Sequence, residues 1–170
     1  MIDEIVVRDA YIDDATCDQM VAFYDEKFNE KNPIRDGRKI FRNPQFPEAI
    51  SFLETQLPRL NAELGARHYI REVFLSLYEK GSFAAAHIDS IDEALKDSLV
   101  VLFYLNDGYE GGEIYFTELN KAYKPQKRQV IYFPCNNPKY THGVLKILDG
   151  KRYIVLMELT LNEQLKVYDI

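Results

Sequence analysis

Tryptophan is absent from this chain of 170 residues, and cysteine occurs only twice. Cys17 and Cys135 lack the close spacing of a metal-binding pair, so we interpret them as free thiols of a cytosolic protein, with a disulfide between them left open. No apolar run approaches the roughly 18 residues of a membrane helix, and the N-terminal segment lacks the basic-then-apolar layout of a signal peptide. We therefore expect a cytoplasmic protein with no membrane partner.

An excess of basic residues is also missing. The chain has 21 Lys and Arg against 27 Asp and Glu, which gives a net charge of −6 and a pI of about 5.1. This balance argues against a nucleic-acid partner, because the overall charge does not attract phosphates. A local basic patch stays open in one segment, formed by Lys31, Arg35, Arg38, Lys39 and Arg42.

The first third of the chain favours helices. Apolar residues recur at helical spacing over residues 15–29, and Asp13 or Asp14 is suited to cap the start of this helix. Pro47 suits the first turn of a second helix, which Pro58 should kink or restart.

The segment between the two helices, residues 29–47, is polar, basic and broken by glycine and proline. A connection of this length in a compact domain is usually functional or disordered. We expect it to be poorly ordered without substrate and to close over a bound polypeptide as a lid.

From residue 67 onward the pattern changes to short strands separated by turns, which fits a barrel or jelly roll with the helices on one outer face. With 46% hydrophobic residues, the chain is expected to form one domain over residues 1–170. Residues 1–66 would hold a first strand, the helices and the loop, and residues 67–162 the jelly-roll core. The expected core strands are HYIREVFLSLY, DSLVVLFYLN, GGEIYF, QVIYFP, THGVLKIL and RYIVLMELTL.

His87-Ile88-Asp89, followed later by His142 and Arg152, is the most informative pattern. Residues i and i+2 of a strand point the same way, so one strand could aim His87 and Asp89 at one ion. Two histidines and one carboxylate on one face of a metal are the usual ligands of non-haem Fe(II) in oxygenases. Arg152 would suit an acidic co-substrate. Chance is the competing explanation for the His-x-Asp pair alone.

Short motifs surround these residues in a fixed order. They are Tyr78-x-x-Gly81, Phe83, His87-x-Asp89, Tyr104-Leu105-Asn106, Gly111-Gly112-Glu113, Pro125, IYFP, Thr141-His142-Gly143-Val144 and Gly150-Lys151-Arg152-Tyr153. In order and spacing the series resembles the prolyl 4-hydroxylase branch of the Fe(II)/2-oxoglutarate dioxygenases, over residues 78–160, about half of the chain.

The resemblance implies a mainly β fold with flanking helices, a double-stranded β-helix that is also called a cupin-like jelly roll. It implies Fe(II) held by His87, Asp89 and His142, with 2-oxoglutarate and O₂ as co-substrates and ascorbate as an optional cofactor. Arg152 would pair with the distal carboxylate of 2-oxoglutarate, with help from Tyr78. The substrate would be a proline-containing protein or peptide, and the co-products succinate and CO₂.

Two positions depart from the family pattern. Arg128 stands where many members have glycine, and Glu158 lies near the place of a frequent tryptophan. The second departure falls where the family often shapes its substrate surface. Two alternatives therefore stay open: an oxygenase that acts on a free amino acid, another side chain or a nucleic-acid component, and a non-catalytic jelly-roll binding module.

The turn before Arg152 predicts how the strands on either side of it pair. A three-residue loop, Leu148-Asp149-Gly150, with a left-handed glycine would pair Lys146 with Arg152 in a hairpin. That register would put His142 and Arg152 on the inner face and turn Lys151 outward. For this reason we choose Arg152 as the anion anchor.

Overall fold

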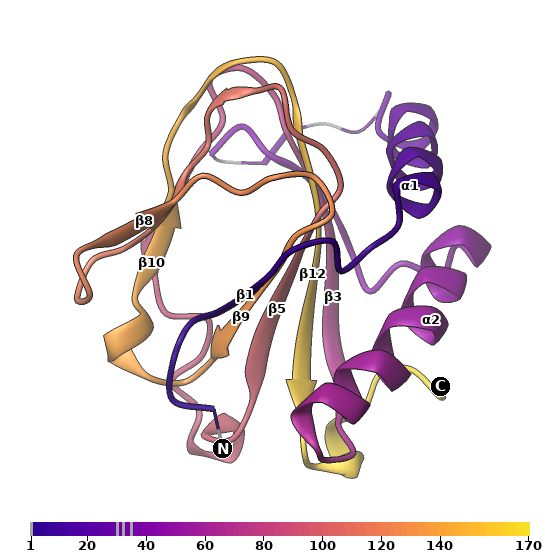
Figure 1. Cartoon of the computed structure of the whole chain (residues 1–170), viewed down its shortest axis with the longest axis vertical. Helices are drawn as coiled ribbons and strands as arrows, with labels where there is room; N and C mark the ends of the chain where they lie inside the picture. The colour runs from indigo at the N-terminus through magenta and orange to yellow at the C-terminus, as the bar shows by residue number, and fades with distance from the viewer. Residues whose placement is uncertain (1, 30, 32, 35) are drawn as a thin grey trace.

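The computed structural model describes residues 2–29, 31, 33–34 and 36–170. Figure 1 shows two helices packed beside antiparallel sheets. A six-stranded sheet has the order β1-β9-β5-β12-β3-β2, a four-stranded sheet the order β4-β10-β7-β8, and β11 pairs with β6. The helices are α1 (Asp14–Lys27) and α2 (Pro47–Leu64). The strands are β1 (Val6–Arg8), β2 (Lys39–Arg42), β3 (Tyr69–Tyr78), β4 (Ala84–His87), β5 (Leu99–Tyr104), β6 (Glu110–Gly111), β7 (Ile114–Phe116), β8 (Lys121–Tyr123), β9 (Val130–Pro134), β10 (His142–Val144), β11 (Ile147–Asp149) and β12 (Arg152–Thr160).

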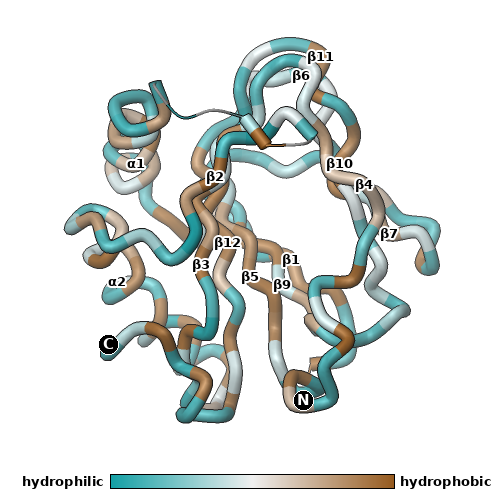
Figure 2. Tube along the Cα trace, turned by 180° about the vertical axis from the view of Figure 1, so that it is seen from behind, coloured by the Kyte–Doolittle hydropathy of each residue, from teal (hydrophilic) through white to brown (hydrophobic). Residues whose placement is uncertain are grey.

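The six-stranded sheet separates two cores, because alternate side chains of a strand point to opposite faces. On β12, Val155 and Met157 pack in the core shared with the helices, whereas Ile154 packs in the core shared with the four-stranded sheet. The apolar trace of the central strands between these layers is visible in Figure 2. Two facing antiparallel sheets with helices on one outer face confirm the predicted jelly roll.

The helix boundaries follow local signals. The side chain of Asp13 accepts a hydrogen bond from the Thr16 amide at 2.8 Å and so caps α1. Helix α2 opens with Pro47 and runs unbroken past Pro58. The alternative that Pro58 would restart the helix is therefore wrong.

The segment 29–47 is more regular than expected. Lys39–Arg42 forms β2, which pairs with β3 as an edge strand of the six-stranded sheet. The expectation of a segment without regular structure is wrong for these residues, because β3 supplies hydrogen-bond partners that the sequence did not reveal. Glu30, Asn32 and Arg35 lie outside the described residues, and the lid stays a prediction.

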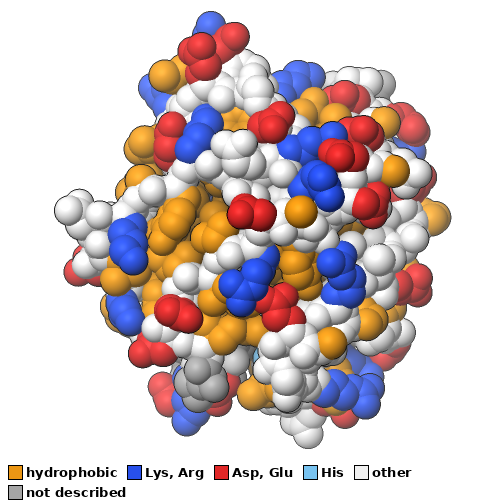
Figure 3. All heavy atoms as spheres, in the orientation of Figure 1, with side chains coloured by type: hydrophobic (Ala, Val, Ile, Leu, Met, Phe, Trp, Pro, Cys, Tyr) orange, Lys and Arg blue, Asp and Glu red, His pale blue; other side chains and the backbone are white. Residues whose placement is uncertain are grey.

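The expected basic patch is largely neutralised within the part of the chain that the structure describes. Arg38 pairs with Asp36 at 2.5 Å, Lys39 pairs with Glu79 at 3.0 Å, and Arg42 pairs with Glu72. Figure 3 shows acidic and basic side chains interspersed over one face, without a continuous basic surface.

Two further expectations concern cysteine and the membrane. Cys17 and Cys135 are both buried free thiols, which leaves no disulfide between them. Among the described residues, neither helix combines the length and apolarity required to cross a bilayer.

The hairpin expected between the His142 and Arg152 strands does not form. Strand β10 pairs with β4 and β7, whereas β12 pairs with β3 and β5 in the other sheet. Gly150 has the predicted positive φ, at 78°. Between the two strands the backbone leaves the four-stranded sheet, forms β11 paired with β6, and then enters the six-stranded sheet. His142 and Arg152 are both buried and Lys151 is exposed, as predicted. A sheet-to-sheet crossing, and not a hairpin register, produces that outcome.

Arg128 occupies a strained position. Its φ is +74°, in the left-handed region that glycine adopts freely. Its guanidinium is held by the Ile12 carbonyl at 2.8 Å and by Asp14 at 3.4 Å. The family glycine is thus explained by backbone geometry, which this chain retains with a different side chain.

We expect Arg128→Gly to be more stable than Arg128→Ala by about 1 kcal/mol, because both lose the guanidinium contacts but only glycine relieves the left-handed strain. Chemical denaturation of the two variants beside the parent measures the difference. Equal stabilities of the two variants, or a more stable alanine variant, would show that residue 128 carries no backbone strain.

Candidate metal centre and co-substrate pocket

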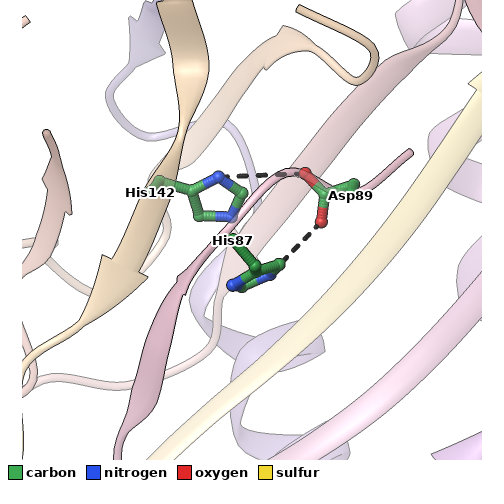
Figure 4. Close-up of side chains that lie close together, drawn as sticks. All are labelled: His87, Asp89 and His142. Atoms are coloured by element: carbon green, nitrogen blue, oxygen red, sulfur yellow. Dashed lines mark ion pairs between the residues drawn. The ribbon is translucent and has the colours of Figure 1, made fainter. Parts of the chain in front are cut away.

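Three side chains predicted as metal ligands lie together in space. His87, Asp89 and His142 each present a ligand atom, and these atoms all lie within 4.8 Å of one another. The His87 Nε2 atom is 3.6 Å from Asp89 Oδ1, and the His142 Nδ1 atom is 3.8 Å from Asp89 Oδ2. Figure 4 shows the carboxylate facing both rings. Such a set could hold one divalent ion.

Two strands and a bend position the cluster. Strands β4 and β10 run antiparallel, and their register places His142 opposite His87. We expected one strand to carry both His87 and Asp89, which is wrong: β4 ends at His87, and Asp89 lies in a bend just after it.

Backbone carbonyls fix the tautomer of both histidines. The Nδ1 atom of His87 lies 2.7 Å from the Ala85 carbonyl, and that of His142 lies 3.0 Å from the Tyr140 carbonyl. A carbonyl only accepts hydrogen bonds, so each neutral ring carries its proton on Nδ1. Each Nε2 atom then has a free lone pair for a metal.

The two rings differ in their surroundings. Burial lowers the pKa of His142, which favours the neutral form that binds metals. The ring of His142 packs against Phe133, with centroids 4.8 Å apart. The Asp89 carboxylate, whose Oδ1 atom lies 3.6 Å from Nε2, raises the pKa of His87 against the opposing effect of burial. The His87 side chain is 42% exposed, so one side of the cluster is open to solvent.

Arg152 is the largest fully buried side chain, and it has no carboxylate partner among the described residues. Its Nη2 atom donates to the Tyr104 hydroxyl at 3.4 Å, while Nε and Nη1 have no hydrogen-bond partner in the part of the chain that the structure describes. A buried charge without a counter-charge costs several kcal/mol. These orphaned donors fit an anion such as the distal carboxylate of 2-oxoglutarate.

Aromatic side chains surround this guanidinium. Its central carbon lies 4.5 Å from the ring centroid of Tyr78 and 5.2 Å from that of Tyr104. The sequence favoured a core role for Tyr104, and the structure gives it both a core position and a contact with Arg152. The sequence analysis did not single out Tyr109 as a residue near Arg152, although it lies inside the motif series. At Gly112, whose φ is +72°, an added Cβ would come within 2.6 Å of Ile147, 3.0 Å of Tyr109 and 3.3 Å of Arg152, which explains the glycine there.

A hollow of about 260 Å³ opens beside the cluster. Its lining includes the metal-ligand candidates His87 and Asp89, together with Tyr78 and Arg38. Its other end is ionic, because the buried carboxylates of Glu72 and Glu158 both pair with Arg71. The sequence analysis named Glu158 only as a departure from the family pattern, and it did not single out Glu72. The remaining lining residues are Ile40, Phe74, Ser76, Ile154 and Leu156.

The third histidine lies apart from this centre. His68 is buried, and its Nδ1 atom lies 3.1 Å from the Ala66 carbonyl. Among the described residues, the single cluster of His, Cys, Asp and Glu with metal-binding geometry does not include it.

Comparison with known proteins agrees with this geometry. A family model described as the 2OG-Fe(II) oxygenase superfamily matches residues 73–157. No curated protein matches the sequence.

Several solved structures share the fold. A viral collagen prolyl hydroxylase from Paramecium bursaria Chlorella virus-1, in complex with 2OG, is 18% identical, with a TM-score of 0.70 and coverage of 93% of this chain and 96% of that one. A Trichoplax adhaerens prolyl hydroxylase, in complex with a hypoxia inducible factor peptide, is 17% identical, with a TM-score of 0.69 and coverage of 98% and 87%. An α-ketoglutarate-dependent carbocyclase from nogalamycin biosynthesis is 12% identical, with a TM-score of 0.73 and coverage of 91% and 78%.

The chain belongs to the 2OG-Fe(II) oxygenase superfamily, because the family model spans half of it. It is a 2-oxoglutarate-dependent dioxygenase that uses Fe(II) and O₂.

Proposed function

We propose that this protein hydroxylates prolyl residues in a polypeptide, in the manner of the prolyl 4-hydroxylase branch, with succinate and CO₂ as co-products. The observation that supports a polypeptide is the open side of the metal cluster. His87 is partly exposed at the end of β4, and β4 and β2 are both edge strands of their sheets. An extended chain could reach the metal from that side. The two prolyl hydroxylases of the same fold support the choice of residue.

In this proposal, the Nε2 atoms of His87 and His142 and the carboxylate of Asp89 would hold Fe(II). When bound, Fe(II) supplies the activation of O₂ that oxidises an unactivated C–H bond. Arg152 binds the distal carboxylate of 2-oxoglutarate. The three metal ligands have no acid–base duty.

The tyrosines around Arg152 have a separate task. Tyr78 and Tyr104 contact the guanidinium, and both are buried together with the nearby Tyr109, so water is largely excluded from the pairing of Arg152 with the carboxylate. A charge-assisted pair is stronger in such surroundings than in water. This arrangement fixes one end of 2-oxoglutarate before the substrate arrives.

Incubation with Fe(II), 2-oxoglutarate, O₂ and proline-containing peptides tests the proposal. We expect a mass gain of one oxygen atom on proline, coupled to succinate formation. The matched control is the same peptide with proline replaced by alanine. Oxygen on the control peptide, or succinate formation without peptide oxidation across a broad proline panel, would reject prolyl hydroxylation and leave the dioxygenase assignment intact.

A free amino acid or other small polar molecule is the second candidate substrate. The ionic end of the hollow supports it, since Glu72, Glu158 and Arg71 would suit a ligand with its own charged groups. Coupled succinate formation with single amino acids, and none with peptides, would favour this candidate.

A further inference from the structure

Arg38, Tyr78 and Arg152 lie side by side at the ends of three neighbouring strands, with Arg38 just before the start of β2. Arg152 is the register partner of Tyr78 between β12 and β3, and Lys39 is the partner of Leu77 between β2 and β3. Arg38, one residue before Lys39, is therefore level with Tyr78 on its other side. Since neighbouring strands lie about 4.8 Å apart, the backbones of the two arginines are separated by roughly 10 Å.

Both guanidiniums contact the same tyrosine. Arg38 Nη1 donates to the Tyr78 hydroxyl at 3.3 Å, and its guanidinium carbon lies 5.5 Å from the ring centroid. The corresponding distance for Arg152 is 4.5 Å. Because the Tyr78 oxygen accepts from Arg38, its own hydrogen is free to donate to a further acceptor.

Arg38 differs from Arg152 in its access to the metal site. Arg38 lines the hollow together with His87 and Asp89, whereas Arg152 is fully buried among tyrosines. Among the described residues, Arg38 has one carboxylate partner, Asp36, and its buried Nε atom has no hydrogen-bond partner. Arg38 therefore keeps donor capacity, and it lines the same hollow as two of the metal-ligand candidates.

We infer that Arg38 and the Tyr78 hydroxyl bind the 2-oxo acid end of 2-oxoglutarate, while Arg152 binds the distal carboxylate. Tyr78 then serves the opposite end of the co-substrate from the one that the family resemblance implies for it. The inference rests on the metal and co-substrate sites of the proposed function. A carboxylate that chelates the metal beside His87 and Asp89 keeps negative charge on its oxygens, and a guanidinium and a phenol are matched donors for it. The co-substrate is thus held by an arginine at each end, with Tyr78 between them.

A matched pair of ligands distinguishes the two ends. 2-Oxobutanoate has the same 2-oxo acid end as 2-oxoglutarate but lacks the distal carboxylate. Binding of each is measured by calorimetry to the protein loaded with Mn(II), so that no turnover is needed. We expect Arg38→Met to weaken both ligands by a similar factor, about tenfold, as for loss of a hydrogen bond to a charged group. Arg152→Met should weaken 2-oxoglutarate alone.

Two control variants separate ligand binding from loop structure. Lys39→Met removes the adjacent basic residue, which pairs with Glu79, and should leave both affinities unchanged. Asp36→Asn removes the ion-pair partner of Arg38 and should leave binding intact or tighter. Should Arg38 act only by fixing the segment, Asp36→Asn would reproduce the loss seen in Arg38→Met, and the inference would be overturned.

The remaining outcomes are also decisive. Arg38→Lys keeps the charge and should retain part of the affinity for both ligands. If thermal unfolding shows that Arg38→Met is misfolded, Arg38→Lys takes its place in the experiment. The inference would be overturned if the folded Arg38 variant lost affinity for 2-oxoglutarate but not for 2-oxobutanoate, or if it lost affinity for neither. Failure of the parent protein to bind 2-oxoglutarate would instead reject the co-substrate site on which it rests.

Discussion

We expect His87→Ala to abolish 2-oxoglutarate turnover while leaving the fold intact. His87 is one of three side chains in the metal cluster, and its side chain is 42% exposed, so its removal leaves little cavity. Loss of a residue that hydrogen-bonds to a metal ligand typically lowers metal affinity or activity about 10- to 100-fold. Loss of a ligand itself should lower them further. Succinate formation, metal content after dialysis and thermal unfolding measure the three effects.

His68→Ala is the matched control for this experiment. It removes the one histidine outside the cluster and should keep both metal content and turnover. Asp89→Ala should behave as His87→Ala does, because its carboxylate faces both rings. A His87→Ala protein that retains its metal and converts 2-oxoglutarate at the parent rate would show that the cluster is not the iron site.

The second large effect is expected at Arg152. Arg152→Met should raise the Michaelis constant for 2-oxoglutarate about ten- to a hundredfold, because a hydrogen-bonded charge contributes roughly 1.5–3 kcal/mol. Metal affinity should stay near that of the parent. The same variant should raise the melting temperature of the co-substrate-free protein, since it removes a buried cation that has no carboxylate partner in the described chain.

Ligand-induced stabilisation provides a second readout for Arg152. 2-Oxoglutarate should raise the melting temperature of the metal-loaded parent by mass action and have much less effect on Arg152→Met. Lys151→Ala is the adjacent basic control: its side chain is 49% exposed with ion-pair distances of 3.9 Å, and such pairs contribute little. A damaging Lys151→Ala beside a silent Arg152→Met would refute the assignment of the anion anchor.

Local chemistry explains which parts of the fold were predictable. The cap at Asp13, the start of α2 at Pro47 and the positive φ of Gly150 depend on neighbouring residues and are confirmed. Strand β2 was missed because Lys39–Arg42 is short and basic, and its partners on β3 come from a distant part of the sequence. The expected hairpin failed for the same reason, since pairing in a jelly roll joins segments far apart in the chain.

By itself, the sequence determined the family, the mainly β class and the four residues proposed for metal and co-substrate, because these depend on residue type and on spacing along the chain. Tertiary structure alone decided that β10 sets His142 opposite His87, that Arg152 is buried without a counter-ion among the residues described, and that Arg38 lies level with Tyr78. The physical reason is that burial and strand pairing are set by contacts between distant segments. A carboxylate or guanidinium acquires its role from the neighbours that those contacts supply.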